Sequence, residues 1–249
     1  MKHVKKLIDN SSYRYENLQY VAEGTRWISD ALQTHASDFV ELFVREDSIE
    51  QHIQIINSFK KNVGNKVTIA KNSVFNTASD TKNSQGILAI LKMPSNAKGL
   101  NLTKHNKVIL LDSIKDPTNA GTIVRTALAA DFNTVIFDSC IDQYNPKVVR
   151  GTMGAMLHVN YIVASLKTNF TDFKNSGYTI IGAALNGENV FTATQKHDKI
   201  VLVVGSEADG IRKDYLPLLD KKLTIPMNQR IESLNASVAA GILMYHLSL

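Results

Sequence analysis

Hydrophobic residues in the second half of the chain form short continuous runs, separated by stretches with helical spacing. The runs are rich in Val, Ile and Leu and do not alternate with polar residues, so both faces of the predicted strands must be covered. This pattern predicts an α/β fold with a mostly parallel sheet flanked by helices. The predicted strands are 108–111, 134–137, 158–163, 178–183, 200–204 and 223–225, and the predicted helices are 120–130, 146–156, 170–175 and 211–219.

The first part of the chain alternates in the same way over a shorter length. Residues 16–32 have helical periodicity with a break at Gly24, and 48–60 have apolar positions at helical spacing. Further strands are predicted at 39–44, 66–70 and 87–91. Pro, Ser and Gly in 94–99 are typical of a linker. We therefore predict a small α/β domain at 1–95, a linker at 96–104 and a larger domain at 105–249.

Composition and charge narrow the class of protein. The chain has 249 residues, of which 44% are hydrophobic and 20% are charged, enough to bury a substantial core. Of the net charge of +5, residues 1–104 carry +4, from 14 Lys and Arg against 10 Asp and Glu. A basic first domain favours binding to a polyanion such as RNA, although an excess of four positive charges is also common on ordinary protein surfaces.

Several sites and locations are not expected. The sequence has no run of about 18 apolar residues, which is the length needed to span a membrane, and its N-terminus lacks a signal-like segment. We therefore expect a cytoplasmic protein without a membrane partner. Neither the single Cys140 nor the seven histidines have the spacing of a zinc site, so no metal is expected. Cys140 is predicted to be a small core residue.

Three polar loops follow predicted strands, where ligands bind in open α/β sheets. In the first, Pro117 and Asn119 are expected to shape a turn, and Arg125 is expected in the early turns of the next helix. Arg125 is either a simple surface residue or a clamp for phosphate. The second loop contains Glu207 between two glycines, and the third leads into a C-terminal helix. The sequence contains no P-loop, no G-x-G-x-x-G and no G-x-S-x-G motif.

Together these loops resemble the motifs of the SpoU (TrmH-like) RNA 2'-O-ribose methyltransferases of the SPOUT superfamily. The motifs are Asp116-Pro-x-Asn119-x-Gly121-x-x-x-Arg125, Gly205-Ser-Glu207-x-x-Gly210, and Ile225-Pro-Met227 with Glu232-Ser-Leu-Asn-x-Ser237. The first part resembles that family's substrate-binding domain, through Glu23-Gly24, Ala31-Leu32, Ser79-Asp-Thr and Gln85-Gly-Ile-Leu-Ala. Gln229 departs from the family, which usually has Gly about two positions after Ile-Pro-Met.

The resemblance implies a deep trefoil knot in the C-terminal domain, a homodimer, and S-adenosylmethionine as methyl donor for an RNA ribose 2'-hydroxyl. The residues expected to bind the nucleotide or to serve catalysis are Arg125, Asn119, Glu207, Asn235 and Ser237. Those expected to bind the cofactor are Ala184, Leu185, Gly205, Ile225, Met227 and Leu234. Asn235 and Ser237 are also placed to cap the C-terminal helix.

The sequence leaves open which RNA is the substrate and whether the fold serves ribose methylation. A separate basic domain favours ribosomal RNA over tRNA as substrate, because folded RNA is recognised mainly by shape and backbone contacts. A non-catalytic RNA-binding protein on the same fold, and a methyltransferase that acts on a base, are the competing hypotheses.

Overall fold

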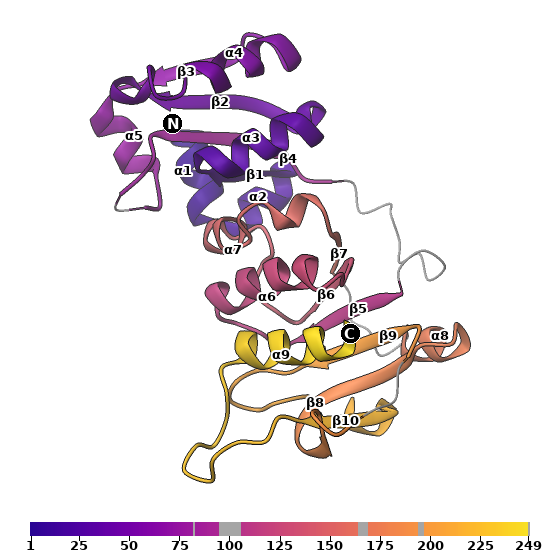
Figure 1. Cartoon of the computed structure of the whole chain (residues 1–249). Coiled ribbons are helices and arrows are strands. Elements are labelled where there is room, and N and C mark those ends of the chain that lie inside the picture. The colour runs from indigo at the N-terminus through magenta and orange to yellow at the C-terminus, as the bar shows by residue number, and fades with distance from the viewer. Residues whose placement is uncertain (82, 95–105, 164–168, 194–196, 249) are drawn as a thin grey trace. The chain divides into compact units, whose positions relative to one another are not determined.

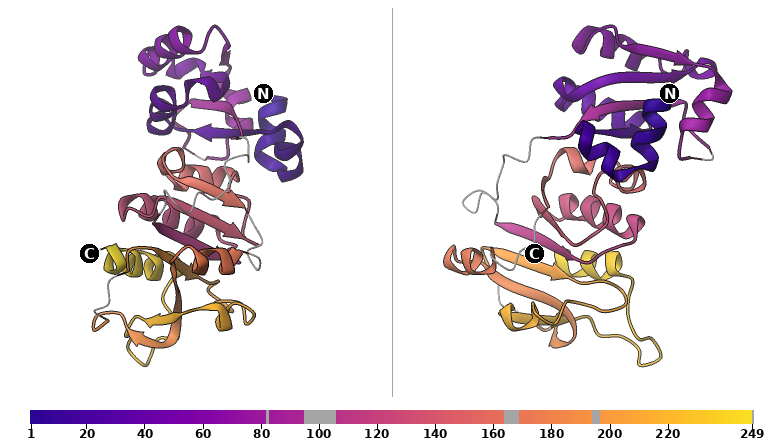
Figure 2. Two further views of the ribbon diagram at one scale, coloured as in Figure 1. Left: turned by 90° about the vertical axis from the view of Figure 1, so that its right-hand side faces the viewer. Right: turned by 180° about the vertical axis from the view of Figure 1, so that it is seen from behind.

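The computed structural model describes residues 1–81, 83–94, 106–163, 169–193 and 197–248 (Figure 1; Figure 2). They belong to two compact units. The first consists of Met1–Ser95 with Asp142–Leu157, and the second of Asn96–Ile141 with His158–Leu249. The predicted linker at 96–104 lies outside the described residues. The first unit thus includes a segment from within the predicted second domain.

The first unit contains a four-stranded mixed sheet in the order β1-β4-β2-β3. Strands β1 and β2 each pair antiparallel with β4, and β3 pairs parallel with β2. Its elements are α1 (Lys2–Asp9), α2 (Ser11–Asn17), β1 (Gln19–Glu23), α3 (Thr25–Thr34), β2 (Phe39–Arg45), α4 (Ile53–Asn62), β3 (Val67–Ala70), α5 (Asn72–Ala78), β4 (Ile87–Lys92) and α7 (Pro146–Gly151), with short 3-10 turns at Ala36–Asp38, Glu46–Ser48 and Ala155–Leu157.

The helical periodicity expected across 16–32 is wrong for Gln19–Glu23, which forms β1. Val21 and Ala22 are buried there, and the strand pairs along its whole length with β4. Pairing with a distant strand therefore overrides the local pattern. The predicted helix at 48–60 begins only at Ile53, after a 3-10 turn at Glu46–Ser48.

The second unit contains a six-stranded parallel sheet in the order β10-β8-β9-β5-β6-β7. This confirms the predicted α/β fold with a parallel sheet and flanking helices. Its elements are β5 (Lys107–Asp112), α6 (Pro117–Ala129), β6 (Thr134–Asp138), β7 (Asn160–Val163), α8 (Asn169–Asn175), β8 (Thr179–Asn189), β9 (Ile200–Val204), a 3-10 turn (Leu216–Leu218), β10 (Lys221–Thr224) and α9 (Ala236–Ser248). The trefoil knot stays a prediction.

Burial explains why the central strands are continuously apolar. Every residue of β6 and β9 is buried, and so is every residue of β5 after Lys107. Their side chains pack with those of α8 and of the segment after β9, for example Phe173 and Tyr215. Because β5 lies between β6 and β9, the carboxyl ends of β5 and β9 are neighbours. The segments that leave these two strands therefore start close together.

Two predicted helices are shorter than expected. Within 211–219 only Leu216–Leu218 is helical, as a 3-10 turn, because Pro217 has no amide hydrogen for an α-helical hydrogen bond. Within 146–156, α7 ends at Gly151, and the left-handed backbone of Met153 (φ 52°) prevents its continuation. Among the described residues, no helix is both long enough and apolar enough to cross a bilayer.

Candidate active site

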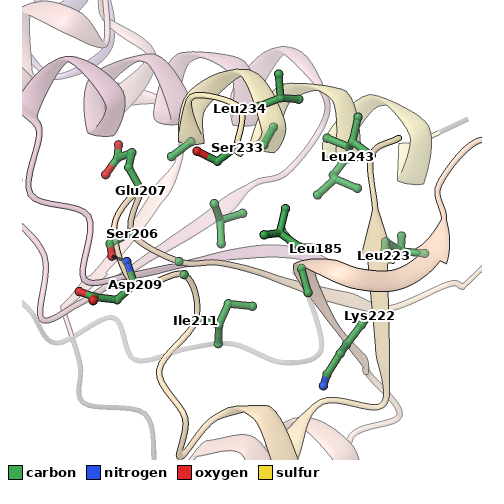
Figure 3. A pocket seen from close by; sticks show the side chains of 18 of the residues that line it. Leu185, Ser206, Glu207, Asp209, Ile211, Lys222, Leu223, Ser233, Leu234 and Leu243 are labelled. Atoms are coloured by element: carbon green, nitrogen blue, oxygen red, sulfur yellow. Dashed lines mark hydrogen bonds between the residues drawn. The ribbon is translucent and has the colours of Figure 1, made fainter. Parts of the chain in front are cut away.

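A cavity of about 540 Å³ lies at the carboxyl ends of β8, β9 and β10 (Figure 3). All six residues predicted to bind a cofactor line it: Ala184, Leu185, Gly205, Ile225, Met227 and Leu234. Figure 3 shows Glu207 and Asp209 at one end, Lys222 and Leu223 at the other, and Leu185 between them. The structure therefore gathers residues from four separate segments around one space.

The wall formed by β8 results from a break in its pairing with β10. Consecutive residues Lys222 and Leu223 pair with Gly182 and Glu188, so the five residues 183–187 leave the ladder. The strand thus continues beyond 183, where it was expected to end. Ala184 and Leu185 lie in this looped-out segment, and the Thr224 hydroxyl fastens it by donating to the Ala184 carbonyl at 2.8 Å. The backbone of 183–187 therefore does not pair residue by residue with β10, and it is tied to that strand through the Thr224 side chain.

The loop after β9 is closed on itself. Ser206 and Gly210 exchange two backbone hydrogen bonds, of 3.2 and 3.0 Å. Gly205 lies so close to the returning chain that a Cβ there would be 2.0 Å from the carbonyl carbon of Gly210. Only glycine permits this approach, and the closed loop presents Glu207 at the end of the cavity.

A chain of hydrogen bonds connects three of the loops. The Asn235 Oδ1 accepts from the amides of Ser237 (2.9 Å) and Val238 (3.3 Å), so Asn235 caps α9. Its Nδ2 donates to Asn119 Oδ1 at 2.9 Å, and Asn119 Nδ2 donates to a Glu207 carboxylate oxygen. Because the Asn235 Oδ1 accepts the two helix amides, the Asn235 Nδ2 is the atom left to donate to Asn119 Oδ1. The Asn119 Oδ1 therefore faces Asn235, and its Nδ2 faces Glu207. This series of hydrogen bonds joins the segments that follow β5, β9 and β10.

Ser237 has a different place from the one expected. It lies inside the first turn of α9, where its hydroxyl donates to Asn235 Oδ1 at 2.6 Å. It therefore supports the cap without being the cap. Asn119, Glu207, Asn235 and Ser237 are brought together, and of these Asn119 is the most buried, with 8% exposed.

Helix α6 begins earlier than predicted. Asp116 caps it by accepting from the Asn119 amide at 2.8 Å, and Pro117 occupies the first turn, so Asn119 is helical and not part of a loop. Arg125 is then the ninth residue of the thirteen in α6, well beyond the early turns. Its side chain is exposed and does not line the cavity. The structure thus leaves Arg125 outside the Asn119–Glu207 cluster.

Of the four charged residues that line the cavity, only Glu207 is among the site residues predicted from the sequence. Asp209, Glu232 and Lys222 line the cavity together with Glu207, which makes three acids and one base. Asp209 and Glu232 lie within the motif segments, and this position was the signal available. The acidic surplus favours a ligand that carries positive charge.

Cys140 does not line the cavity. Burial raises the pKa of the Cys140 thiol to about 11, which keeps it protonated near neutral pH, and its Sγ donates to the Leu111 carbonyl at 3.1 Å. Within the described parts of the chain, no group of three or more His, Cys, Asp or Glu residues could hold a metal ion.

The hydrogen-bonded chain gives a first prediction. Asn119→Asp removes the donor to Glu207 and places a second carboxylate beside it, which disfavours ionisation of both. We expect a loss of about 1–3 kcal/mol in transition-state stabilisation at neutral pH. The shared proton raises one carboxyl pKa, so activity relative to the unmodified protein should recover as pH falls. The measurement is a pH profile of the initial rate of the methyl transfer to RNA that the resemblance of the motifs implies.

Asn145→Asp is the matched control for this substitution. Asn145 caps α7 through its Oδ1, which accepts from the Lys147 amide at 2.9 Å, and an aspartate preserves that acceptor. Its rate should match that of the unmodified protein at each pH. A flat ratio for Asn119→Asp across the pH range would contradict the proposed carboxylate pair.

Comparison with known proteins defines the class of this protein. Residues 106–245 match the SpoU rRNA Methylase family, and residues 21–97 match the family described as RNA 2'-O ribose methyltransferase substrate binding. The chain belongs to the SpoU rRNA methylase family, as the three motifs predicted.

Two relatives match nearly the whole chain. The 23S rRNA (guanosine(2553)-2'-O)-methyltransferase RlmP of Bacillus subtilis is 28% identical over 97% of this chain and 93% of its own length. The 23S rRNA (guanosine-2'-O-)-methyltransferase RlmB of Coxiella burnetii is 30% identical over 89% of this chain and 92% of its own.

Solved structures share the fold. The AdoMet-bound rRNA methyltransferase from Sinorhizobium meliloti has a TM-score of 0.83 at 24% identity, covering 99% of this chain and 92% of that one. At this identity the likeness concerns the fold alone.

Proposed function

We propose that this protein is an S-adenosylmethionine-dependent methyltransferase that modifies a ribose 2'-hydroxyl of ribosomal RNA. The observation that carries the proposal is the position of Glu207, which both lines the cavity and ends the Asn235–Asn119 chain. A cofactor in the cavity and a nucleotide beside Asn119 would meet at this residue. The names of RlmP and RlmB, as 23S rRNA 2'-O-methyltransferases, support the same substrate class.

The cavity fits S-adenosylmethionine in size and chemistry. Its volume of about 540 Å³ is within the range of small-molecule sites. Leu185, Ile225, Met227 and Leu234 offer apolar surface for an adenine ring, and the looped-out segment 183–187 offers backbone groups for its edge. The acidic surplus complements the sulfonium and ammonium charges. When bound, this cofactor supplies an electrophilic methyl group.

The chain's own residues position the nucleotide. Asn119 is held in one orientation and can present the ribose to the cavity, which lowers the entropic part of the barrier. The Arg125 guanidinium stays protonated and so cannot be the general base. We assign it to the phosphate next to the target ribose, where it stabilises charge on the 2'-oxygen. The proton leaves to that phosphate, to water or to the Glu207 carboxylate.

A homodimer and a cytoplasmic location remain part of the proposal. Val238 and Tyr245 are each 50% exposed and lie seven residues apart, and so on one face of α9. Apolar side chains on one helical face support association of two copies. Size-exclusion chromatography with light scattering measures the mass that decides this point.

Methylation of defined RNAs tests the function. The purified protein is incubated with S-adenosylmethionine and either ribosomal RNA or tRNA, and the RNA is then digested to nucleosides for mass spectrometry. We expect a new methyl group on the ribose of a ribosomal RNA nucleoside. A methyl on the base, or on tRNA alone, would overturn the substrate assignment. Failure to bind the cofactor in calorimetry would favour a non-catalytic RNA-binding protein.

A further inference from the structure

Arg212 lies between two buried carboxylates just after the loop that carries Glu207. Its Nε is 2.5 Å from Asp112 Oδ1, and its Nη2 is 2.6 Å from Asp138 Oδ2. Its backbone amide also donates to Asp112 Oδ2 at 2.7 Å. Asp112 and Asp138 are 0% and 1% exposed. One guanidinium therefore joins two carboxylates that solvent does not reach.

The two carboxylates are held side by side by matching turns. Asp112 and Asp138 are register partners at the ends of β5 and β6. Each is followed by a serine with left-handed backbone, Ser113 at φ 62° and Ser139 at φ 55°, whose hydroxyl donates to the preceding aspartate at 3.1 and 3.0 Å. A planar fork suits two carboxylates fixed in this way better than a single ammonium does.

Tyr215 completes this cluster. It is fully buried, its hydroxyl donates to Asp138 Oδ2, and its ring centre is 4.3 Å from the Arg212 guanidinium carbon. Burial by itself lowers the pKa of Arg212, but the hydrogen bond to Asp138 and the charges of Asp112 and Asp138 outweigh it and raise that pKa. The guanidinium therefore remains charged and its plane is held by the ring.

We propose that Arg212 is a positioning residue. It holds the Gly205–Gly210 loop at the carboxyl ends of the strands, so that Glu207 faces both the cavity and Asn119. One end of this loop continues from buried β9, and its other end is tied to β5 and β6 only two residues after Gly210, through Arg212. This role rests on the proposed function for its consequence in methyl transfer. The anchoring itself is a property of the protein without ligand.

A purely structural role for Arg212 would lower stability without changing the cavity. Arg14 provides the matched control, because it too is an arginine that pairs with a carboxylate, Asp142, at 2.5 Å; it is 3% exposed, whereas the Arg212 side chain is 32% exposed. It donates to the Leu7 carbonyl as well, at 2.6 Å. Arg14 belongs to the first unit and does not line the cavity.

The experiment compares Arg212→Met, Arg212→Lys and Arg14→Met in the full chain. Hydrogen exchange of the Ser206 and Gly210 amides is measured without ligand, and S-adenosylmethionine affinity by calorimetry. For Arg212→Met we expect both protection and affinity to fall roughly tenfold to hundredfold, as when a buried charge loses its partner. Arg212→Lys should fall between Arg212→Met and the unmodified protein. Arg14→Met should lower the melting temperature but leave both measurements unchanged.

The outcomes separate the inference from the proposed function. Unchanged protection and affinity in Arg212→Met, or an equal loss in Arg14→Met, would overturn the positioning role. If Arg212→Met does not fold, Arg212→Lys and Tyr215→Phe decide the question in the same way, since each keeps most of the packing. An unmodified protein that fails to bind S-adenosylmethionine would contradict the proposed function, while the exchange comparison would still test the anchor.

Discussion

Replacing Gly205 by alanine should abolish cofactor binding. The added Cβ would lie 2.0 Å from the Gly210 carbonyl carbon, 2.2 Å from its oxygen and 2.3 Å from the Ile211 amide nitrogen. All three are backbone atoms, so no side-chain rotation can relieve the overlap. The Ser206–Gly210 bridge must open, which removes Glu207 from its place between the cavity and Asn119. We expect no S-adenosylmethionine binding in calorimetry and no methyl transfer.

Gly241→Ala serves as the control for this change. Gly241 lies inside α9, and a Cβ there would meet only the Thr126 methyl group of α6, at 3.5 Å, which is ordinary contact. Alanine in a helix interior is favoured over glycine by roughly 0.5–1 kcal/mol, so this variant should bind the cofactor normally and melt slightly higher. Normal cofactor affinity in Gly205→Ala would disprove the tight closure of the loop.

Replacing Arg125 by alanine should leave cofactor affinity unchanged and remove most methylation. Arg125 does not line the cavity, so its loss does not alter the surface that holds the cofactor. As an exposed cation on α6, six residues after Asn119, it is assigned to the RNA phosphate beside the target ribose. Losing such a charge-assisted contact in the transition state costs about 1.5–3 kcal/mol, or tenfold to more than hundredfold in rate.

Separate measurements of affinity and rate test this assignment. Calorimetry gives the cofactor affinity, and single-turnover methylation gives the rate with bound RNA. Arg125→Lys is the control, because it retains the charge but loses the bidentate fork, and it should recover part of the rate. If Arg125→Ala methylates RNA at the normal rate, the residue has no role in the reaction.

Much of the site could be predicted because parallel strands bring their carboxyl ends to one edge of a sheet. Ala184, Gly205 and Ile225 come from three separate segments of the chain, yet they line one cavity together with Leu234. The start of α6 was also readable, since an Asp before a Pro is a helix N-terminus signal. A turn is predicted there instead, and a helix that begins at 120 places Arg125 too early in it.

The ion pairs of Arg212 had no such signal. Asp112 and Arg212 are 100 residues apart in the chain. The pairing depends on β5 and β6 ending in the same register and on the chain returning there after β9. The helix expected at 211–219 was wrong, because Pro217 lies inside the predicted span and has no amide hydrogen to donate.

The sequence by itself determined the parallel α/β fold, the family and the segments that surround the cavity, because these depend on hydrophobic runs and motifs that are local in the chain. Only the tertiary structure decided that Glu207, Asn119 and Asn235 form one hydrogen-bonded chain, that Arg125 stands apart from it, and that Arg212 joins two strand ends. These contacts depend on directions and distances between side chains of separate segments, which local patterns do not encode.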